Sequence, residues 1–190
     1  MKLRVQWRPE IGLNRRGQAW QGFQGLDGEA YRARDGKAFM MDMTWITDRI
    51  AVGGAIWRTE NMAEVVRAGI THILDMQIEF DDTPLAGPYG IAVLWNPVDD
   101  DFQPKSADVF RRGVEFARQA LDEPEARVYV HCAAGVHRAP MMTLAILCSM
   151  GWELGEAMQT IQARRPVVDF ADVYVDSVKS FLQEQVETSG

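Results

Sequence analysis

Residues 128–143 read VYVHCAAGVHRAPMMT, and the order of elements in this stretch decides the fold class. The β-branched and aromatic residues at 128–130 favour a strand. The apolar run at 141–150 is long enough for a helix that is hydrophobic on nearly every side, which is typical of a buried helix. A buried strand, a tight loop and a buried helix therefore follow one another, as in an α/β fold.

The loop between this strand and this helix has the composition of an anion-binding site. The backbone N–H groups of such a loop and the positive end of the helix dipole point at one spot, where they hold a phosphate-like anion. Gly135 supplies the backbone freedom for the turn, and Pro140 suits the first helical turn. Arg138 can bind two phosphate oxygens at once through its planar guanidinium.

Cys132 lies at the start of the same loop. Most unpaired cysteines are buried and act as small hydrophobic residues. The positive field of an anion-binding loop, however, favours the thiolate, which is the nucleophilic form. We therefore interpret Cys132 as a nucleophile that shares its loop with a phosphate site.

The segment His131–Arg138, HCAAGVHR, resembles the HCxxGxxR signature loop of the cysteine-dependent protein phosphatases, in particular the small dual-specificity branch. The resemblance implies that Cys132 is the catalytic nucleophile, that Arg138 is catalytic and binds phosphate, and that His131 is a buried histidine that braces the loop. It also implies that no metal or organic cofactor is needed. The other expected substrate-binding residues are those of the loop: Ala133, Ala134, Gly135, Val136 and His137.

A phosphatase also needs an acid that protonates the departing oxygen. Asp99, Asp100 and Asp101 follow the strand predicted over residues 91–95. The resembling enzymes place their acid on this loop, about ten residues before an aromatic residue of the next helix. Counted back from Phe110, this spacing indicates Asp100 as the general acid, and Asp99 is the alternative. We expect the crowding of three carboxylates to keep at least one of them protonated.

Ala139 departs from the common pattern, which has Ser or Thr after the arginine. In the resembling enzymes that hydroxyl stabilises the cysteine thiolate as it leaves the phosphoenzyme. An Arg-Ala-Pro sequence resembles the laforin-related glucan phosphatases, although those carry glycine where this chain has His137. The likeness covers roughly residues 44–185, and further similar segments are MQIEFD at 76–81, MGWEL at 150–154 and ARRPVV at 163–168.

The rest of the chain alternates between strand and helix patterns. Strands are predicted over residues 45–52, 70–76 and 91–95, and helices over Thr59 to Gly69, Pro104 to Pro124, Glu153 to Arg164 and Ala171 to Gln185. This order predicts one α/β domain with a central, mostly parallel sheet flanked by helices. We place that catalytic domain at residues 44–187, after a glycine-rich extension at residues 1–43. Asp35-Gly36 predicts a hairpin turn there, and the extension either packs on the domain edge or faces substrate.

Composition limits the classes of protein that fit. The 190 residues are 47% hydrophobic and 25% charged, as in a single domain with a sizeable core. The net charge of −7 argues against nucleic acid as a partner, although residues 1–40 carry +4 and the remainder −11. The N-terminus MKLRVQW lacks the apolar core of a signal peptide, and no apolar run is long enough to span a membrane. With only two cysteines, one of them the candidate nucleophile, we expect a reducing, cytoplasmic location.

The sequence thus predicts a phosphatase that hydrolyses phosphomonoesters through a cysteinyl-phosphate intermediate. Phosphotyrosine, phosphoserine and phosphothreonine of proteins are the expected substrates. The loop lacks the lysines with which resembling lipid phosphatases bind inositol head groups. Two alternatives stay open: a phosphoglucan phosphatase, and a weakly active phosphate-binding adaptor, which the absence of a hydroxyl at Ala139 favours.

Overall fold

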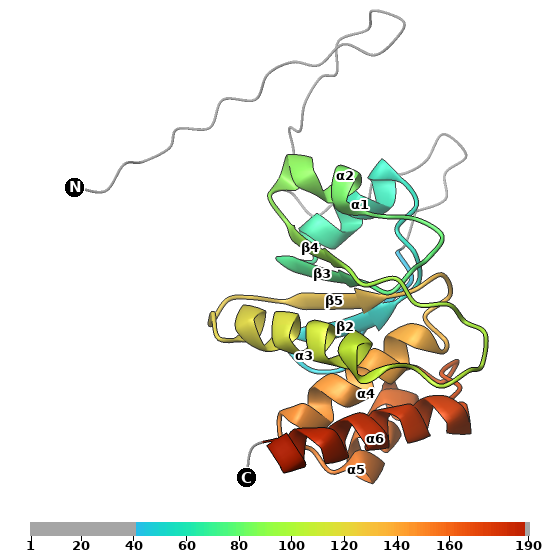
Figure 1. The fold of residues 1–190 in the computed structure, drawn as a ribbon. Coiled ribbons are helices and arrows are strands. Elements are labelled where there is room, and N and C mark those ends of the chain that lie inside the picture. The colour runs from blue at the N-terminus through green and yellow to red at the C-terminus, as the bar shows by residue number, and fades with distance from the viewer. Residues whose placement is uncertain (1–40, 189–190) are drawn as a thin grey trace, which may run out of the picture. The chain divides into compact units, whose positions relative to one another are not determined.

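The computed structural model describes residues 41–188, so the expected hairpin at Asp35-Gly36 and most of the expected extension lie outside the described residues. Five strands form one sheet in the order β1-β2-β5-β3-β4 (Figure 1). The strands are β1 (Met43–Trp45), β2 (Ile50–Gly53), β3 (His72–Asp75), β4 (Ala92–Trp95) and β5 (Val128–His131). The helices are α1 (Thr59–Arg67), α2 (Thr83–Ala86), the 3-10 helix η1 (Gly87–Tyr89), α3 (Ala107–Leu121), α4 (Arg138–Ser149), α5 (Leu154–Arg164) and α6 (Asp172–Thr188).

Strand β5 lies at the centre of the sheet. It pairs in parallel with β2 and with β3, so Val128 lies opposite both Ile50 and His72. Strand β4 continues the parallel arrangement, whereas β1 at the other edge is antiparallel to β2. All four residues of β5 are buried, as expected for a parallel strand covered on both faces. The predicted α/β domain with a mostly parallel sheet is confirmed.

Helices cover both faces of this sheet (Figure 1). Helices α3, α4, α5 and α6 pack on one face, and α1 and α2 pack on the other. Side chains along β5 alternate between the two cores, with Val128 and Val130 in the first and Tyr129 in the second. In α4, every residue from Arg138 to Leu147 is buried, which confirms the prediction of a helix that is apolar on nearly every side.

The single strand predicted over residues 45–52 is wrong, because the chain reverses within it. Thr47 Oγ1 accepts the backbone N–H groups of Arg49 at 3.2 Å and Ile50 at 3.0 Å. These side-chain bonds stabilise a turn that competes with a continuous strand. The run is therefore divided between β1 and β2, which pair with each other.

Two other boundaries differ from the prediction. Pro104 does not open α3, which starts at Ala107, three residues later. Helices α2 and η1 were not predicted, because segments this short carry no helical periodicity. The end of α1 at Gly69 is confirmed, since this glycine adopts a left-handed φ of 75°. Within residues 41–188, no helix combines the length and the apolar composition that crossing a membrane requires.

Candidate active site

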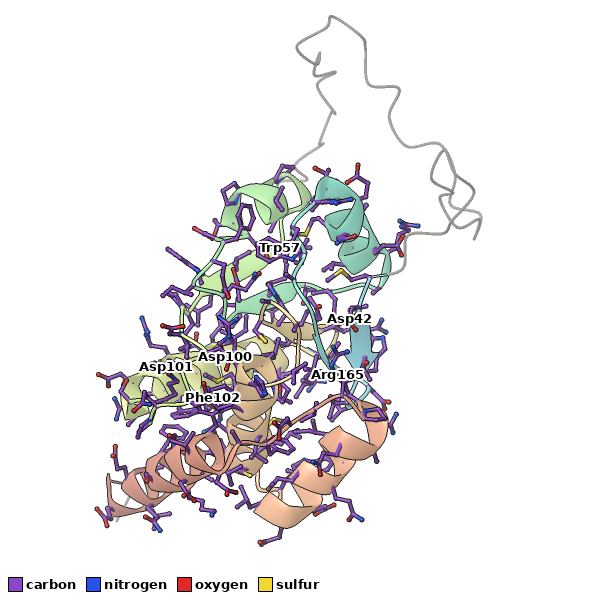
Figure 2. The ribbon with its side chains drawn as sticks, turned by 90° about the vertical axis from the view of Figure 1, so that its right-hand side faces the viewer. Asp42, Trp57, Asp100, Asp101, Phe102 and Arg165 are labelled. Atoms are coloured by element: carbon purple, nitrogen blue, oxygen red, sulfur yellow. The ribbon has the colours of Figure 1, made fainter. Side chains whose placement is uncertain are left out.

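The loop from Cys132 to His137 lies between the carboxyl end of β5 and the start of α4. Four connections surround it, from β2 to α1, from β3 to α2, from β4 to α3 and from α5 to α6. In Figure 2, Asp100, Asp101 and Phe102 lie on one side of this region, and Asp42 and Arg165 lie on the other. The central position of β5 therefore brings residues from distant parts of the sequence to one loop.

The carbonyl groups of the loop point outward. Ala133 O accepts the N–H of Ala55 at 3.1 Å, and Val136 O accepts the N–H of Asp169 at 3.1 Å. The carbonyls between them, of Ala134 and Gly135, accept the Arg165 guanidinium at 3.1 and 2.8 Å. In a trans peptide the N–H points opposite to the C=O. The N–H groups that follow these carbonyls therefore point toward the centre of the loop, as an anion-binding loop requires.

Cys132 lies at the base of this loop and is 1% exposed. Its Sγ accepts the backbone N–H of Gly135 at 3.3 Å. Gly135 has a φ of 64°, and a Cβ at this position would lie 2.5 Å from the carbonyl oxygen of Gly53. Both the backbone conformation and the close approach to β2 therefore require glycine here.

Arg138 is held by an acidic residue that was not predicted as part of the site. Its Nη1 and Nη2 donate to Glu79 at 2.9 and 2.8 Å, and Nη1 also donates to Val98 O at 2.9 Å. The hydrogen bond from Arg138 lowers the pKa of Glu79. Arg138 Nε is buried and has no hydrogen-bond partner. The Nε and Nη2 edge of the guanidinium is thus the edge that can bind two phosphate oxygens.

Among the three consecutive aspartates, Asp100 is the one that contacts the loop. Its Oδ2 lies 3.1 Å from His137 Nδ1 and 3.7 Å from Arg138 Nε, and its Oδ1 accepts the Tyr174 hydroxyl at 3.0 Å. Asp99 is exposed. Asp101 pairs with Lys105, and this hydrogen bond lowers the pKa of Asp101, so Asp101 is not a carboxyl whose pKa is raised by crowding. The catalytic role of Asp100 stays a prediction.

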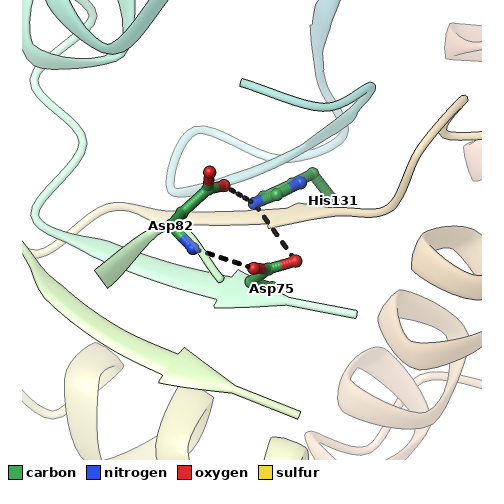
Figure 3. Close-up of side chains that lie close together, drawn as sticks. All are labelled: Asp75, Asp82 and His131. Atoms are coloured by element: carbon green, nitrogen blue, oxygen red, sulfur yellow. Dashed lines mark hydrogen bonds and ion pairs between the residues drawn. The ribbon is translucent and has the colours of Figure 1, made fainter. Parts of the chain in front are cut away.

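His131 belongs to a buried cluster with Asp75 and Asp82 (Figure 3). Its Nε2 is 2.9 Å from Asp82 Oδ2 and 3.8 Å from Asp75 Oδ1. Asp75 Oδ2 also accepts the backbone N–H of Asp82 at 3.3 Å. Burial raises the pKa of Asp75 to about 6, although His131 opposes this shift. The cluster ties β5 to the segment that carries Glu79.

The same three side chains place ligand atoms within 4.8 Å of one another. The 2.9 Å separation between His131 and Asp82 is typical of an ion pair. Two ligands of a tetrahedral zinc ion, each about 2.0–2.1 Å from the metal, lie about 3.3 Å apart. We therefore interpret this cluster as a direct contact between the histidine and the two aspartates.

Two further residues of the site were missed from the sequence. Arg165 binds Asp42 with both terminal nitrogens, at 2.8 and 2.7 Å, while it holds the loop carbonyls. Tyr174 belongs to α6, where an aromatic residue on an apolar helix face is indistinguishable from a core residue by sequence. Arg165 had a weak signal, because it lies in the 163–168 segment that resembles the glucan branch.

Comparisons with known proteins agree with this geometry. Residues 57–184 match the family model "Dual specificity phosphatase, catalytic domain". Mouse dual specificity protein phosphatase 13B is 30% identical over 142 residues, which cover 74% of this chain and 60% of that protein. Mouse protein phosphatase Slingshot homolog 3 is 31% identical over 117 residues, which cover 60% of this chain and 17% of that protein. The chain thus spans 60% or less of the length of these relatives.

The fold is shared with solved phosphatase structures. The crystal structure of PTPMT1 in complex with PI(5)P aligns with a TM-score of 0.70 at 19% identity, over 78% of this chain and 99% of that chain. The resemblance to the laforin-related branch stays a prediction, because these relatives carry other names. The family model covers well over half of the residues, and the chain therefore belongs to the dual specificity phosphatase family.

Proposed function

We propose that this protein is a phosphatase that hydrolyses phosphomonoesters through a cysteinyl-phosphate intermediate. The observation that carries the proposal is the convergence on one loop of the Cys132 thiol, the inward N–H groups and Arg138, whose Nε makes no hydrogen bond. A nucleophile at the base of an anion-binding loop is the arrangement that phosphoryl transfer to sulfur requires.

In the first step, the Cys132 thiolate attacks phosphorus and the bond from phosphorus to the ester oxygen breaks. The loop N–H groups and the free edge of Arg138 bind the nonbridging oxygens, whose charge grows in the transition state. Asp100 protonates the departing oxygen. In the second step, water attacks phosphorus, Asp100 accepts its proton, and the bond between sulfur and phosphorus breaks. No metal or organic cofactor takes part in these steps.

The charges around the loop favour substrates with a single phosphate. The side chains of His137 and Arg138 contact three carboxylates, those of Glu79, Asp100 and Asp169. The other loop side chains carry no charge. A ligand with several phosphates, such as an inositol polyphosphate, would therefore meet negative charge beyond the loop. This supports phosphorylated tyrosine, serine or threonine side chains of proteins as the substrates.

An aromatic pair lies beside the chain segment that holds Arg138. The rings of Trp57 and Phe80 have centroids 5.9 Å apart, and Phe80 follows Glu79 directly. Trp57 is 47% exposed and has a left-handed φ of 52°, which is costly for a bulky residue and is typical of functional sites. The two rings, tilted by 50° to each other, offer an apolar surface to a substrate ring. A phenyl ring and the face of a sugar both fit such a surface, so the phosphoglucan alternative belongs in the substrate test.

We place the catalytic domain at residues 44–187, after an extension at residues 1–43. Strand β1 starts at Met43, and Asp42 just before it contacts Arg165, so the end of the extension contributes to the site. The mechanism needs a reduced thiol, which favours a cytoplasmic location.

Phosphate release from a panel of substrates tests the proposal. The panel holds phosphotyrosyl, phosphoseryl and phosphothreonyl peptides, phosphorylated amylopectin and inositol phosphates, and Cys132→Ser is the control. We expect turnover of phosphopeptides by the wild type and none by the variant, because a serine hydroxyl is not ionised at neutral pH. Binding of phosphopeptides without turnover would instead support the adaptor alternative, and preferred release from amylopectin would support the glucan alternative.

A further inference from the structure

His137 has a carboxylate at each of its ring nitrogens. Nδ1 lies 3.1 Å from Asp100 Oδ2, and Nε2 lies 3.5 Å from Asp169 Oδ2. A neutral imidazole has a single N–H, so only the protonated ring can donate to both carboxylates. The geometry therefore fits an imidazolium that bridges Asp100 and Asp169.

The remaining contacts of Asp100 come from groups whose protonation does not change near neutral pH. Burial is the main cause that raises the pKa of Tyr174 to about 12, so its hydroxyl keeps donating to Asp100 Oδ1. Arg138, whose Nε lies 3.7 Å from Oδ2, is always charged. Within the described part of the chain, the His137 imidazole is thus the contact of Asp100 that can both hold and release a proton.

The charged groups that face His137 come from two loops and from its own helix. Asp100 belongs to the connection from β4 to α3, Asp169 to the connection from α5 to α6, and Arg138 follows His137 in sequence. Asp169 is anchored to the loop, because its backbone N–H donates to Val136 O at 3.1 Å. Its carboxylate is 69% exposed and so connects the ring to solvent.

Phe102 fixes the ring from a third direction. Its ring meets the edge of His137 with centroids 5.1 Å apart and stacks on Tyr174 at 5.8 Å. Its backbone N–H also donates to the Tyr174 hydroxyl at 3.0 Å. Phe102 has a left-handed φ of 55°, and such strain persists only where surrounding contacts hold it. The contacts of Asp100, His137, Phe102 and Tyr174 therefore form one ordered unit.

We propose that His137 is a positioning residue that keeps a proton available to the general acid Asp100 at neutral pH. This inference rests on the proposed function. In the first step, the Nδ1 proton of the imidazolium passes to Oδ2 of the Asp100 carboxylate, and Asp100 passes a proton on to the departing oxygen. The products of the step are the alcohol, the cysteinyl-phosphate, neutral His137 and the Asp100 carboxylate. In the second step, the proton of the attacking water passes through Asp100 back to Nδ1, and the imidazolium is restored.

The test is the pH profile of kcat/KM for an alkyl phosphate in His137→Asn. The asparagine amide lies close to the position of Nδ1, so it can still donate to Asp100 but cannot supply a proton. We expect the descending limb of the profile to move to lower pH, because the variant lacks the imidazolium that returns a proton to Asp100. At pH 7 we expect a loss of about a hundredfold, as for a lost general acid. The loss with p-nitrophenyl phosphate should be much smaller, because that leaving group needs little protonation.

Three comparisons make the test specific. His72→Gln is the matched control, because His72 contacts Thr71 and Phe116 away from the loop, and its profile should equal that of the wild type. Asp169→Asn should move the descending limb of the pH profile in the same direction as His137→Asn does, but by a smaller amount. Added imidazole should restore alkyl phosphate turnover to His137→Ala, in which the ring is missing.

Two results would overturn the inference. One is a wild-type profile in His137→Asn, and the other is an equal loss with both substrates at every pH, which is what a purely structural role predicts. A failure of the proposed function would be seen in a different variant. In that case Cys132→Ser would retain phosphatase activity, whatever the pH profile of His137→Asn.

Discussion

Arg138 and Glu79 form a two-point ion pair, in which Nη1 and Nη2 donate to the two carboxylate oxygens at 2.9 and 2.8 Å. This contact fixes the plane of the guanidinium, because a planar fork paired at two points cannot rotate freely. Nε makes no hydrogen bond and lies 3.7 Å from Asp100 Oδ2, so its edge is not occupied by Glu79. Glu79 thereby determines which edge of Arg138 is available to substrate.

Glu79→Ala should therefore weaken catalysis although Glu79 does not take part in the reaction. Without its partner, Arg138 loses two charge-assisted hydrogen bonds and the fixed plane that they impose. We expect kcat/KM for p-nitrophenyl phosphate to fall by about tenfold to a hundredfold. Glu125→Ala, at an exposed position, is the matched control and should behave as the wild type. Equal kinetics of the two variants would show that Arg138 is oriented by other contacts.

The identity of the general acid is tested by Asp100→Asn and Asp99→Asn. Asp100→Asn should slow an alkyl phosphate by about 10²–10⁴-fold and p-nitrophenyl phosphate far less. Asp99→Asn should have little effect, because Asp99 is exposed whereas Asp100 contacts His137 and Tyr174. A large loss of alkyl phosphate turnover in Asp99→Asn and a small one in Asp100→Asn would instead identify Asp99 as the general acid.

The sequence was sufficient for the main features of both fold and site. The run from β5 through the loop to α4 predicted a buried strand, the buried helix and the positions of Cys132 and Arg138 at one loop. The spacing from Asp100 to Phe110 selected the aspartate that contacts this loop. These features could be predicted because they depend on residues close together in the sequence.

The features that were missed depend on contacts between distant segments. Glu79 and Arg165 lie in segments that resemble the glucan branch, and Asp42 has no such signal. Their roles arise only when β1, the β3–α2 connection and the α5–α6 connection meet at the loop. The division between β1 and β2 was missed for another reason. The side-chain bonds of Thr47 that stabilise the turn are not visible in the alternation of apolar residues.

Asp75 should make stability depend on pH. Burial raises its pKa from 3.8 to about 6, so the folded state binds this proton more tightly than the unfolded state. The stabilisation that this proton gives the folded state is complete below pH 3.8 and is lost as the pH rises through about 6. The difference between the two pKa values corresponds to about 3 kcal/mol of unfolding free energy, at 1.36 kcal/mol per pH unit. Urea unfolding of the wild type and of Asp75→Asn from pH 4 to pH 7 measures this change in stability.

The quantity to follow is the difference in unfolding free energy between these two proteins. We expect the wild type to lose stability relative to Asp75→Asn as the pH rises. Asp48→Asn, at an exposed site, should show a constant difference from the wild type. A constant difference for Asp75→Asn as well would mean that His131 compensates the buried charge fully.

Ala139 should make the second chemical step slow. It is fully buried at the start of α4, and the nearby Thr143 hydroxyl donates to the Ala139 carbonyl at 2.9 Å, so that hydroxyl is engaged. A lost hydrogen bond to a charged group costs about 1.5–3 kcal/mol, or roughly ten- to a hundredfold in rate. Rapid mixing with p-nitrophenyl phosphate should show a burst of nitrophenol near one equivalent, and Ala139→Ser should reduce the burst and raise the steady rate. No burst, together with an unchanged rate in Ala139→Ser, would show that the first step is limiting.

The cysteinyl-phosphate intermediate is the central claim, and trapping it is the most direct measurement. The enzyme is mixed with p-nitrophenyl phosphate, quenched in acid within the burst and digested, and the peptide that contains Cys132 is examined by mass spectrometry. We predict one added phosphoryl group on Cys132, and none in Cys132→Ser. Rapid turnover without phosphorylated Cys132 in the burst, or with the phosphoryl group on another residue, would contradict the account.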